Sequence, residues 1–167
     1  MATIKSEVNV DAPVEEVWQI LADFGGIQRF NPGVPRSIQT SDGPVGLGTT
    51  RHCDLTIPGA SIEERITGWV DGHSYEVEIF SSKRTPPLNH ARATLAVRPA
   101  ERGTMASMQI DYRLKGGWLG SLMDVVMVRR QYEKTVDGVL AGLKHHAETG
   151  ELVDGISDVK HLTVARG

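Results

Sequence analysis

A run of strand-like segments followed by one long helical pattern is the feature that most limits how this chain can fold. Alternating polar and apolar residues recur between Arg36 and Leu114, and most of the separators carry Gly, Pro, Asp or Asn. Short strands with brief links predict an antiparallel meander rather than βαβ units. The candidate strands are Ser37–Ser41, Thr49–Ile57, Ser61–Val70, Ser74–Ser82, Asn89–Arg98 and Thr104–Leu114.

The pattern after Gly116-Gly117 changes to helical spacing and continues to Gly150. A helix over about 119–149 would be roughly 45 Å long. A helix of this length with one apolar face needs a sheet to lie against, and the meander is the sheet available. We therefore expect an α+β fold in which a curved antiparallel sheet wraps the closing helix. Small inward residues such as Ser6 and Ala106 favour a hollow between them.

The N-terminal segment completes this order of elements. Ile4–Val10 alternates as a first strand, which gives the sheet seven strands. Asp11 is placed to cap a following amphipathic helix, whose apolar stripe includes Trp18, and one more helical turn is expected over 27–31. Residues 1–150 are interpreted as a single domain, and the polar residues 151–167 as a loose tail.

Composition excludes several classes of function. The chain has 167 residues and a formal charge of −3, so it shows no electrostatic footprint for nucleic acid or an anionic membrane. Cys53 is the single cysteine, and the histidines lack metal-ligand spacing. We expect no metal, no cofactor and no integral membrane segment, because no run of about 18 apolar residues occurs. The first residues lack the apolar block of a signal peptide, so a cytoplasmic protein is expected.

A carboxylate falls where the strand pattern demands an apolar residue, in Thr56–Ile66 (TIPGASIEERI). Pro58-Gly59 predicts a turn, and Glu64 then shares a strand face with Ile62 and Ile66. An inward carboxylate is costly unless it is paired, hydrogen-bonded or wet. Two interpretations remain open and equal: a lined cavity, or a structural ion pair with Arg51 on the neighbouring strand.

The same alternation assigns the other inward residues. Leu55 and Ile57 select the inward side of their strand, which turns Arg51 inward as well. Tyr75 and Tyr112 take inward positions on later strands, either as core tyrosines or as ligand contacts. Apolar walls with a few convergent polar groups are typical of small-molecule pockets.

Three stretches resemble one known superfamily. They are VNVDAPVEEVWQILADFGGIQRFNPGV, VGLGTTRHCDLTIPGASIEERITGWVDGHSYEVEI and LGSLMDVVMVRRQYEKTVDGVLAGLKHHAETG. Together they resemble the START/Bet v 1-like superfamily (SRPBCC), in its polyketide cyclase/dehydrase-like branch, over roughly residues 3–150. The resemblance implies the helix-grip fold, with a hydrophobic ligand cavity between sheet and helix, and lipid binding in some members. It places Phe30 at the cavity mouth.

A more distant resemblance is to plant abscisic-acid receptors, whose gate loop and Glu-Arg strand are similar to IPGASIEER. It implies a gate at Pro58, Gly59 and Ala60 and a second mouth loop around 83–88, including Pro86, Pro87 and Leu88. The receptors' His-Arg-Leu latch and pocket lysine have no counterpart here. Only the geometry of a gated cavity is therefore implied, and hormone sensing is not.

These observations predict a protein that binds a small hydrophobic, partly oxygenated molecule as a carrier, sensor or sequestering protein, as monomer or homodimer. The first alternative is a polyketide cyclase/dehydratase-type lyase or isomerase with Glu64 as acid or base. The second is a protein-interaction module of the ubiquinone-binding or toxin type. Binding is preferred because Arg51 is placed to keep Glu64 ionised and no second acid–base group stands beside it. The candidate ligand-binding residues are Phe30, Arg51, Leu55, Ile57, Glu64, Tyr75, Val77, Asn89, Ala91, Tyr112, Met123 and Met127.

Overall fold

The computed structural model describes residues 1–85, 88–114, 122–153 and 165–166, with only the backbone described at 88–90, 114, 122–125 and 165–166. The elements follow the predicted order of strand, short helices, meander and long helix. They are β1 (Ala2–Val10), α1 (Val14–Ala22), η1 (Phe24–Arg29), β2 (Arg36–Gln39), β3 (Thr50–Asp54), β4 (Ser61–Val70), β5 (Ser74–Lys83), β6 (Leu88–Pro99), β7 (Thr104–Leu114), α2 (Leu122–Thr149) and β8 (Ala165–Arg166).

The strands form one antiparallel sheet in the order β2-β3-β4-β5-β6-β7-β1-β8. This arrangement confirms the predicted curved sheet of seven meander strands. The eighth strand comes from the C-terminal segment, where Ala165 and Arg166 pair with Glu7 and Ser6. A two-residue strand carries no periodicity, so the sequence pattern could not predict it.

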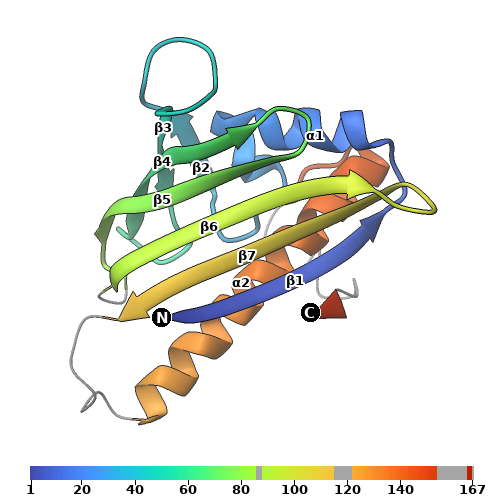
Figure 1. Ribbon diagram of the computed structural model, residues 1–167. Coiled ribbons are helices and arrows are strands. Elements are labelled where there is room, and N and C mark those ends of the chain that lie inside the picture. The colour runs from blue at the N-terminus through green and yellow to red at the C-terminus, as the bar shows by residue number, and fades with distance from the viewer. Residues whose placement is uncertain (86–87, 115–121, 154–164, 167) are drawn as a thin grey trace.

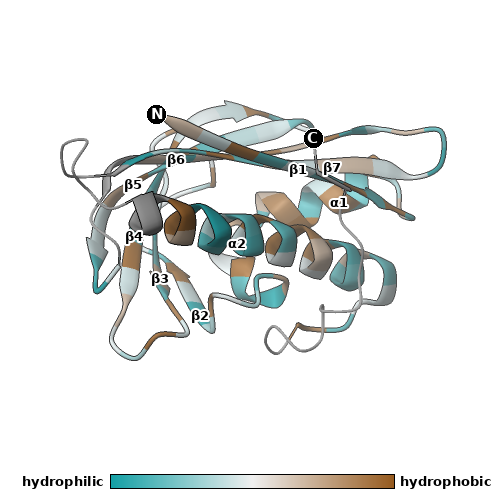
Figure 2. Ribbon diagram, turned by 90° about the horizontal axis from the view of Figure 1, so that it is seen from below, coloured by the Kyte–Doolittle hydropathy of each residue, from teal (hydrophilic) through white to brown (hydrophobic). Residues whose placement is uncertain are grey.

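The sheet arches over α2 in the two views of the molecule (Figure 1, Figure 2). In Figure 2 the helices lie on one side of the sheet, and the strands β2–β4 bend down beside α2. The helix packs against β1 and β7. Its buried residues there are Val136, Val139, Leu140 and Leu143. The described part of α2 begins at Leu122, so the expected residues 119–121 lie outside the described residues.

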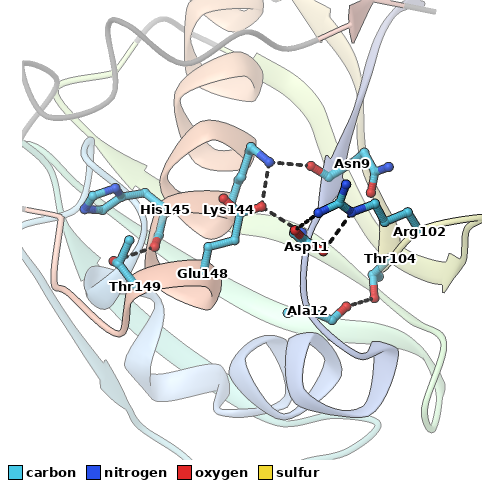
Figure 3. Close-up of polar contacts among 9 residues, drawn as sticks. All are labelled: Asn9, Asp11, Ala12, Arg102, Thr104, Lys144, His145, Glu148 and Thr149. Carbon is cyan, nitrogen blue, oxygen red and sulfur yellow. Dashed lines mark hydrogen bonds and ion pairs between the residues drawn. The ribbon is translucent and has the colours of Figure 1, made fainter.

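A polar network fixes the C-terminal half of α2 to the end of β1 (Figure 3). Lys144 Nζ donates to the Asn9 carbonyl at 2.7 Å and pairs with Glu148 at 2.6 Å. The Asp11 backbone N–H donates to the same Glu148 carboxylate at 2.7 Å. The Asp11 carboxylate pairs with Arg102 at 3.0 Å. Each cation here already has a carboxylate partner.

Two expectations are wrong, one about the N-terminal segment and one about the C-terminal segment. Asp11 does not cap α1, because the helix begins after Pro13, whose carbonyl accepts from the Val17 N–H at 3.1 Å. The C-terminal segment is not loose throughout, since Val153 is buried and its N–H donates to the Arg29 carbonyl at 3.0 Å.

Phe30 also departs from its expected place, because it is 1% exposed and belongs to the core rather than to a cavity mouth. A Cβ atom at Gly142 of α2 would lie 1.9 Å from the Phe30 carbonyl oxygen. The segment after η1 therefore packs directly on the backbone of α2, at a position where only glycine leaves room. This close approach holds Phe30 inside the core.

Candidate functional site

The β3–β4 hairpin places a buried ion pair on the inner face of the sheet. The strand register puts Arg51 opposite Glu64. Arg51 Nε donates to Glu64 Oε2 at 2.6 Å, and the two side chains are 2% and 8% exposed. In the described residues, these two are the buried charged residues of the protein. The predicted inward assignment of both residues thus agrees with their positions.

Arg51 also links the sheet to the short helix η1. Its Nη1 donates to the Phe24 carbonyl at 2.8 Å, and its guanidinium carbon lies 4.0 Å from the centre of the Phe24 ring. Burial is the largest single effect and lowers the pKa of Arg51, but the attractions of Glu64, Tyr75 and Cys53 together leave that pKa raised above its ordinary value. The guanidinium is therefore a permanent cation held by a carboxylate, a carbonyl and an aromatic face.

Cys53 lies beside this pair on the same face of β3. Its Sγ lies 3.7 Å from Glu64 Oε2 and 3.5 Å from the Ser37 hydroxyl. Burial is the main cause that raises the pKa of the Cys53 thiol to about 12. A thiol held protonated is a poor nucleophile, so Cys53 supports the pair rather than supplying chemistry.

Tyr75 carries the one orphan hydroxyl of this cluster. Its ring packs between Phe24 and Trp69, with ring centres 5.9 Å and 6.2 Å away. The hydroxyl oxygen is buried and has no hydrogen-bond partner of acceptable geometry within the part of the chain that the structure describes. Burial raises the pKa of Tyr75 and outweighs the opposing effect of the nearby Arg51 charge. The phenol therefore stays protonated and keeps a proton to donate.

Tyr112 does not join these groups. It is 3% exposed, and its ring centre lies 4.7 Å from that of Tyr132 on α2. Burial raises the pKa of Tyr112, with smaller effects from Arg129 and Glu133. Among the described residues, no contact links it to Arg51 or Glu64. Three of the four predicted polar groups therefore lie together, and the fourth lies under α2.

The predicted apolar wall is present in part. Val77 of β5 and Ala91 of β6 are buried. Ile57 is 57% exposed and Met127 is 68% exposed, so the inward placement of these two residues is wrong. Strand β3 ends at Asp54, where the Leu55 N–H turns to the Ala60 carbonyl at 2.9 Å. Alternation therefore stops before Ile57 and leaves Leu55 half-buried. The side chains of Asn89 and Met123 lie outside the described residues.

The two expected gate loops touch each other. Arg84 Nη1 donates to the Pro58 carbonyl at 3.2 Å, and a Cβ atom at Gly59 would lie 3.3 Å from the same guanidinium. Arg84 adopts a φ of 52°, in the left-handed region that residues other than glycine seldom occupy. Ala60 is 2% exposed and anchors its side of the turn, Leu88 opens β6, and 86–87 lie outside the described residues.

Sequence reasoning missed Phe24 and the Trp69 contact. Phe24 lies in a 3-10 helix of six residues, too short to show a period. Trp69 comes to the Tyr75 side through a register shift between Ile66 and Gly68, which simple alternation cannot anticipate.

Metal and membrane sites find no support in the described parts of the chain. Among those residues, no group of three or more His, Cys, Asp or Glu side chains could hold a metal ion. No helix in the same residues is long and apolar enough to cross a membrane. A surface depression of about 180 Å³ is lined by Asn9, Asp11, Arg102 and Lys144, and it shares no residue with the Arg51–Glu64 cluster.

A curved antiparallel sheet wrapped around a long C-terminal helix, with a polar cluster on the inner face, defines the helix-grip class of START and Bet v 1 proteins. The family model described as "Polyketide cyclase / dehydrase and lipid transport" matches residues 1–148. The chain belongs to this family. No curated protein matches the sequence.

Solved structures share the fold at low sequence identity. A START superfamily protein from Mycobacterium smegmatis is 15% identical, with a TM-score of 0.71 over 87% of this chain and 97% of that one. Ara h 8.0201 is 12% identical, with a TM-score of 0.69 over the same two shares. The di-domain ARO/CYC BexL from the BE-7585A biosynthetic pathway is 21% identical, with a TM-score of 0.69, over 89% of this chain and 47% of that one. At these identities the likeness shows the fold alone.

Proposed function

We propose that this protein binds a small hydrophobic, partly oxygenated molecule between the inner face of the sheet and α2. The observation that carries the proposal is the polar cluster of Arg51, Glu64 and Tyr75 beneath apolar strands, in which the Tyr75 hydroxyl has no protein partner among the described residues. A buried polar group without a partner costs free energy, so a function that gives it one is the simplest reason to keep it.

The loops around Pro58 and Arg84 are proposed as the entrance. The hydrogen bond that joins them in the described residues, at 3.2 Å between the exposed Arg84 and Pro58, is weak enough to break when a ligand passes. Loops on a rigid scaffold are the usual place for such a device.

Native mass spectrometry of the protein purified from its own host tests the proposal. The wild-type protein should carry extra mass from a bound small molecule, and Glu64→Gln should lose it. Glu63→Gln is the matched control, because Glu63 is the next residue and faces the opposite side of the sheet, where it pairs with His52. Wild-type protein that carries nothing, or equal loads in both variants, would contradict the proposal.

A cyclase or dehydratase activity is the second candidate. It is favoured by the family description and by the protonated Tyr75, which could donate to a substrate carbonyl while Glu64 accepts a proton. Turnover of a poly-β-ketone substrate that is lost in Tyr75→Phe, with binding retained, would favour the enzyme over the carrier.

A further inference from the structure

We infer that the site selects an uncharged ligand bearing a hydroxyl or ketone oxygen and rejects carboxylates. This inference rests on the proposed binding function. Two properties of the cluster of Arg51, Glu64 and Tyr75 support it: its buried charges cancel, and the Tyr75 hydroxyl needs a hydrogen-bond acceptor. Arg51 and Glu64 form a 2.6 Å pair, and the Tyr75 hydroxyl beside them lacks a partner within the described residues.

The charge balance concerns the two buried ions. Arg51 supplies one positive charge and Glu64 one negative charge, and in the described residues no third charged side chain is buried. The guanidinium is further satisfied by the Phe24 carbonyl at 2.8 Å and the Phe24 ring at 4.0 Å. A ligand carboxylate would therefore enter a site whose cation is already neutralised. An extra buried charge without a partner is strongly unfavourable.

The hydrogen-bond demand points to an oxygen on the ligand. The Tyr75 hydroxyl can donate one hydrogen bond, which a ketone or hydroxyl oxygen would accept. The contacts of Glu64 with Arg51 and Cys53 both fall on Oε2. A carboxylate has a second oxygen, Oε1, which can accept a hydrogen bond from a ligand hydroxyl. A ligand hydroxyl suits both residues, because its oxygen accepts the hydrogen bond from Tyr75 and its proton can be donated to the Glu64 carboxylate. The aromatic faces of Phe24 and Trp69 around Tyr75 favour a ring beside that oxygen.

The absence of a lone cation distinguishes this site from one built for acids. A site for a carboxylate needs an arginine or lysine whose charge is not already used inside the protein. Removing the Glu64 charge would create such a site without moving Arg51. The inference therefore predicts that Glu64→Gln inverts the charge preference rather than merely weakening all binding.

Three matched probes separate these effects: naphthalene, 2-naphthol and 2-naphthoate, measured by equilibrium dialysis at neutral pH. In the wild-type protein, 2-naphthol should bind about 3- to 10-fold more tightly than naphthalene, the value of one net hydrogen bond. The carboxylate should bind more weakly than naphthalene by about 10-fold or more. Tyr75→Phe should remove most of the advantage of 2-naphthol and leave naphthalene unchanged.

Glu64→Gln should raise the affinity for 2-naphthoate above that for naphthalene, whereas the control Glu63→Gln should keep the wild-type order. Wild-type protein that binds 2-naphthoate as tightly as 2-naphthol would overturn the inference and leave the binding function standing. Failure of the wild-type protein to bind any of the three probes would overturn both. If Glu64→Gln does not fold, the wild-type order and Tyr75→Phe still decide the question.

Discussion

The β3–β4 hairpin carries two ion pairs on neighbouring rungs, one on each face of the sheet. On the inner face, Arg51 and Glu64 are 2% and 8% exposed. On the outer face, His52 and Glu63 are 32% and 31% exposed, and His52 also reaches Asp54 at 3.1 Å. The same strand register therefore builds one pair in a dry interior and one pair at the edge of water.

The difference in burial separates what each pair contributes. A half-exposed pair is screened by solvent and is worth at most about 1 kcal/mol. A buried pair can add little to net stability, yet it becomes very costly when one partner is removed. We therefore expect removal of an inner partner to lower the free energy of unfolding far more than removal of an outer one. The outer pair should instead make stability depend on pH.

Removal of Arg51 should give the largest effect. Arg51→Met leaves the Glu64 carboxylate buried without its partner and frees the Phe24 carbonyl, so the free energy of unfolding should fall by about 3–5 kcal/mol. Urea unfolding measures this loss, and His52→Gln on the next residue is the control. A fall below about 1 kcal/mol would show that the inner pair behaves like the outer one.

Replacement of both inner partners should hurt less than replacement of one. In Arg51→Met with Glu64→Leu, the uncompensated charge disappears, and similar replacements of buried pairs are often neutral. The double variant should regain at least half of the stability lost by Arg51→Met, as a double-mutant cycle reports. Additive losses in this cycle would mean that the two side chains do not interact strongly.

The sequence could predict this pairing better than its surroundings. Alternation predicts that Arg51 and Glu64 point inward, and the structure agrees, since Cys53 and Ile66 on the same faces are fully buried. Leu55 and Ile57 do not mark the inward side, since β3 ends at Asp54 and the turn carries Ile57 into solvent. Local periodicity decides a face within a strand, but it does not say where the strand stops.

The surroundings of the pair depend on contacts distant in sequence. The contact of the Arg51 guanidinium with the Phe24 ring joins η1 to β3. The burial of Phe30 depends on the missing side chain of Gly142 on α2, which leaves room for the Phe30 carbonyl. Neither contact leaves a period in the sequence. The overall fold was predictable because seven strands and one long helix each carry a pattern, whereas the site is built by tertiary packing.

The outer pair should make the folding stability depend on pH. Hydrogen bonds that the His52 ring donates to the Glu63 and Asp54 carboxylates raise the pKa of His52 above its ordinary value of 6.5. Arg36, 4.0 Å from Asp54, is the other charge nearby. A raised pKa in the folded state gives stabilisation that is fully present below about pH 6.5. This stabilisation is lost as the pH rises through the higher folded value.

Urea unfolding between about pH 5 and pH 9 measures this dependence. The wild-type protein should lose up to about 1 kcal/mol across that window, and His52→Gln should lose less. If the free energy of unfolding depends on pH identically in both proteins, the outer pair does not contribute to stability.

The smallest effect is expected at residues 55–60, the turn between β3 and β4, when its contact with Arg84 is removed. Arg84→Ala removes the hydrogen bond to the Pro58 carbonyl and the packing on Gly59. It leaves the strain of the positive φ at residue 84 in place, because alanine also carries a Cβ atom. Amide hydrogen exchange in residues 55–60 should become faster by about 3- to 10-fold, with global stability little changed. Unchanged exchange in this turn would mean that Arg84 does not restrain it.

The inner pair, and not the outer one, is expected to face a bound molecule. The most direct test is to follow the side-chain carboxyl ¹³C resonances of Glu64 and Glu63 by NMR while 2-naphthol is added. The Glu64 signal should shift and saturate with the dissociation constant found by dialysis, while the Glu63 signal should stay in place. Saturable binding of 2-naphthol that leaves the Glu64 signal unmoved, or shifts both carboxyl signals equally, would show that the ligand does not contact the inner pair.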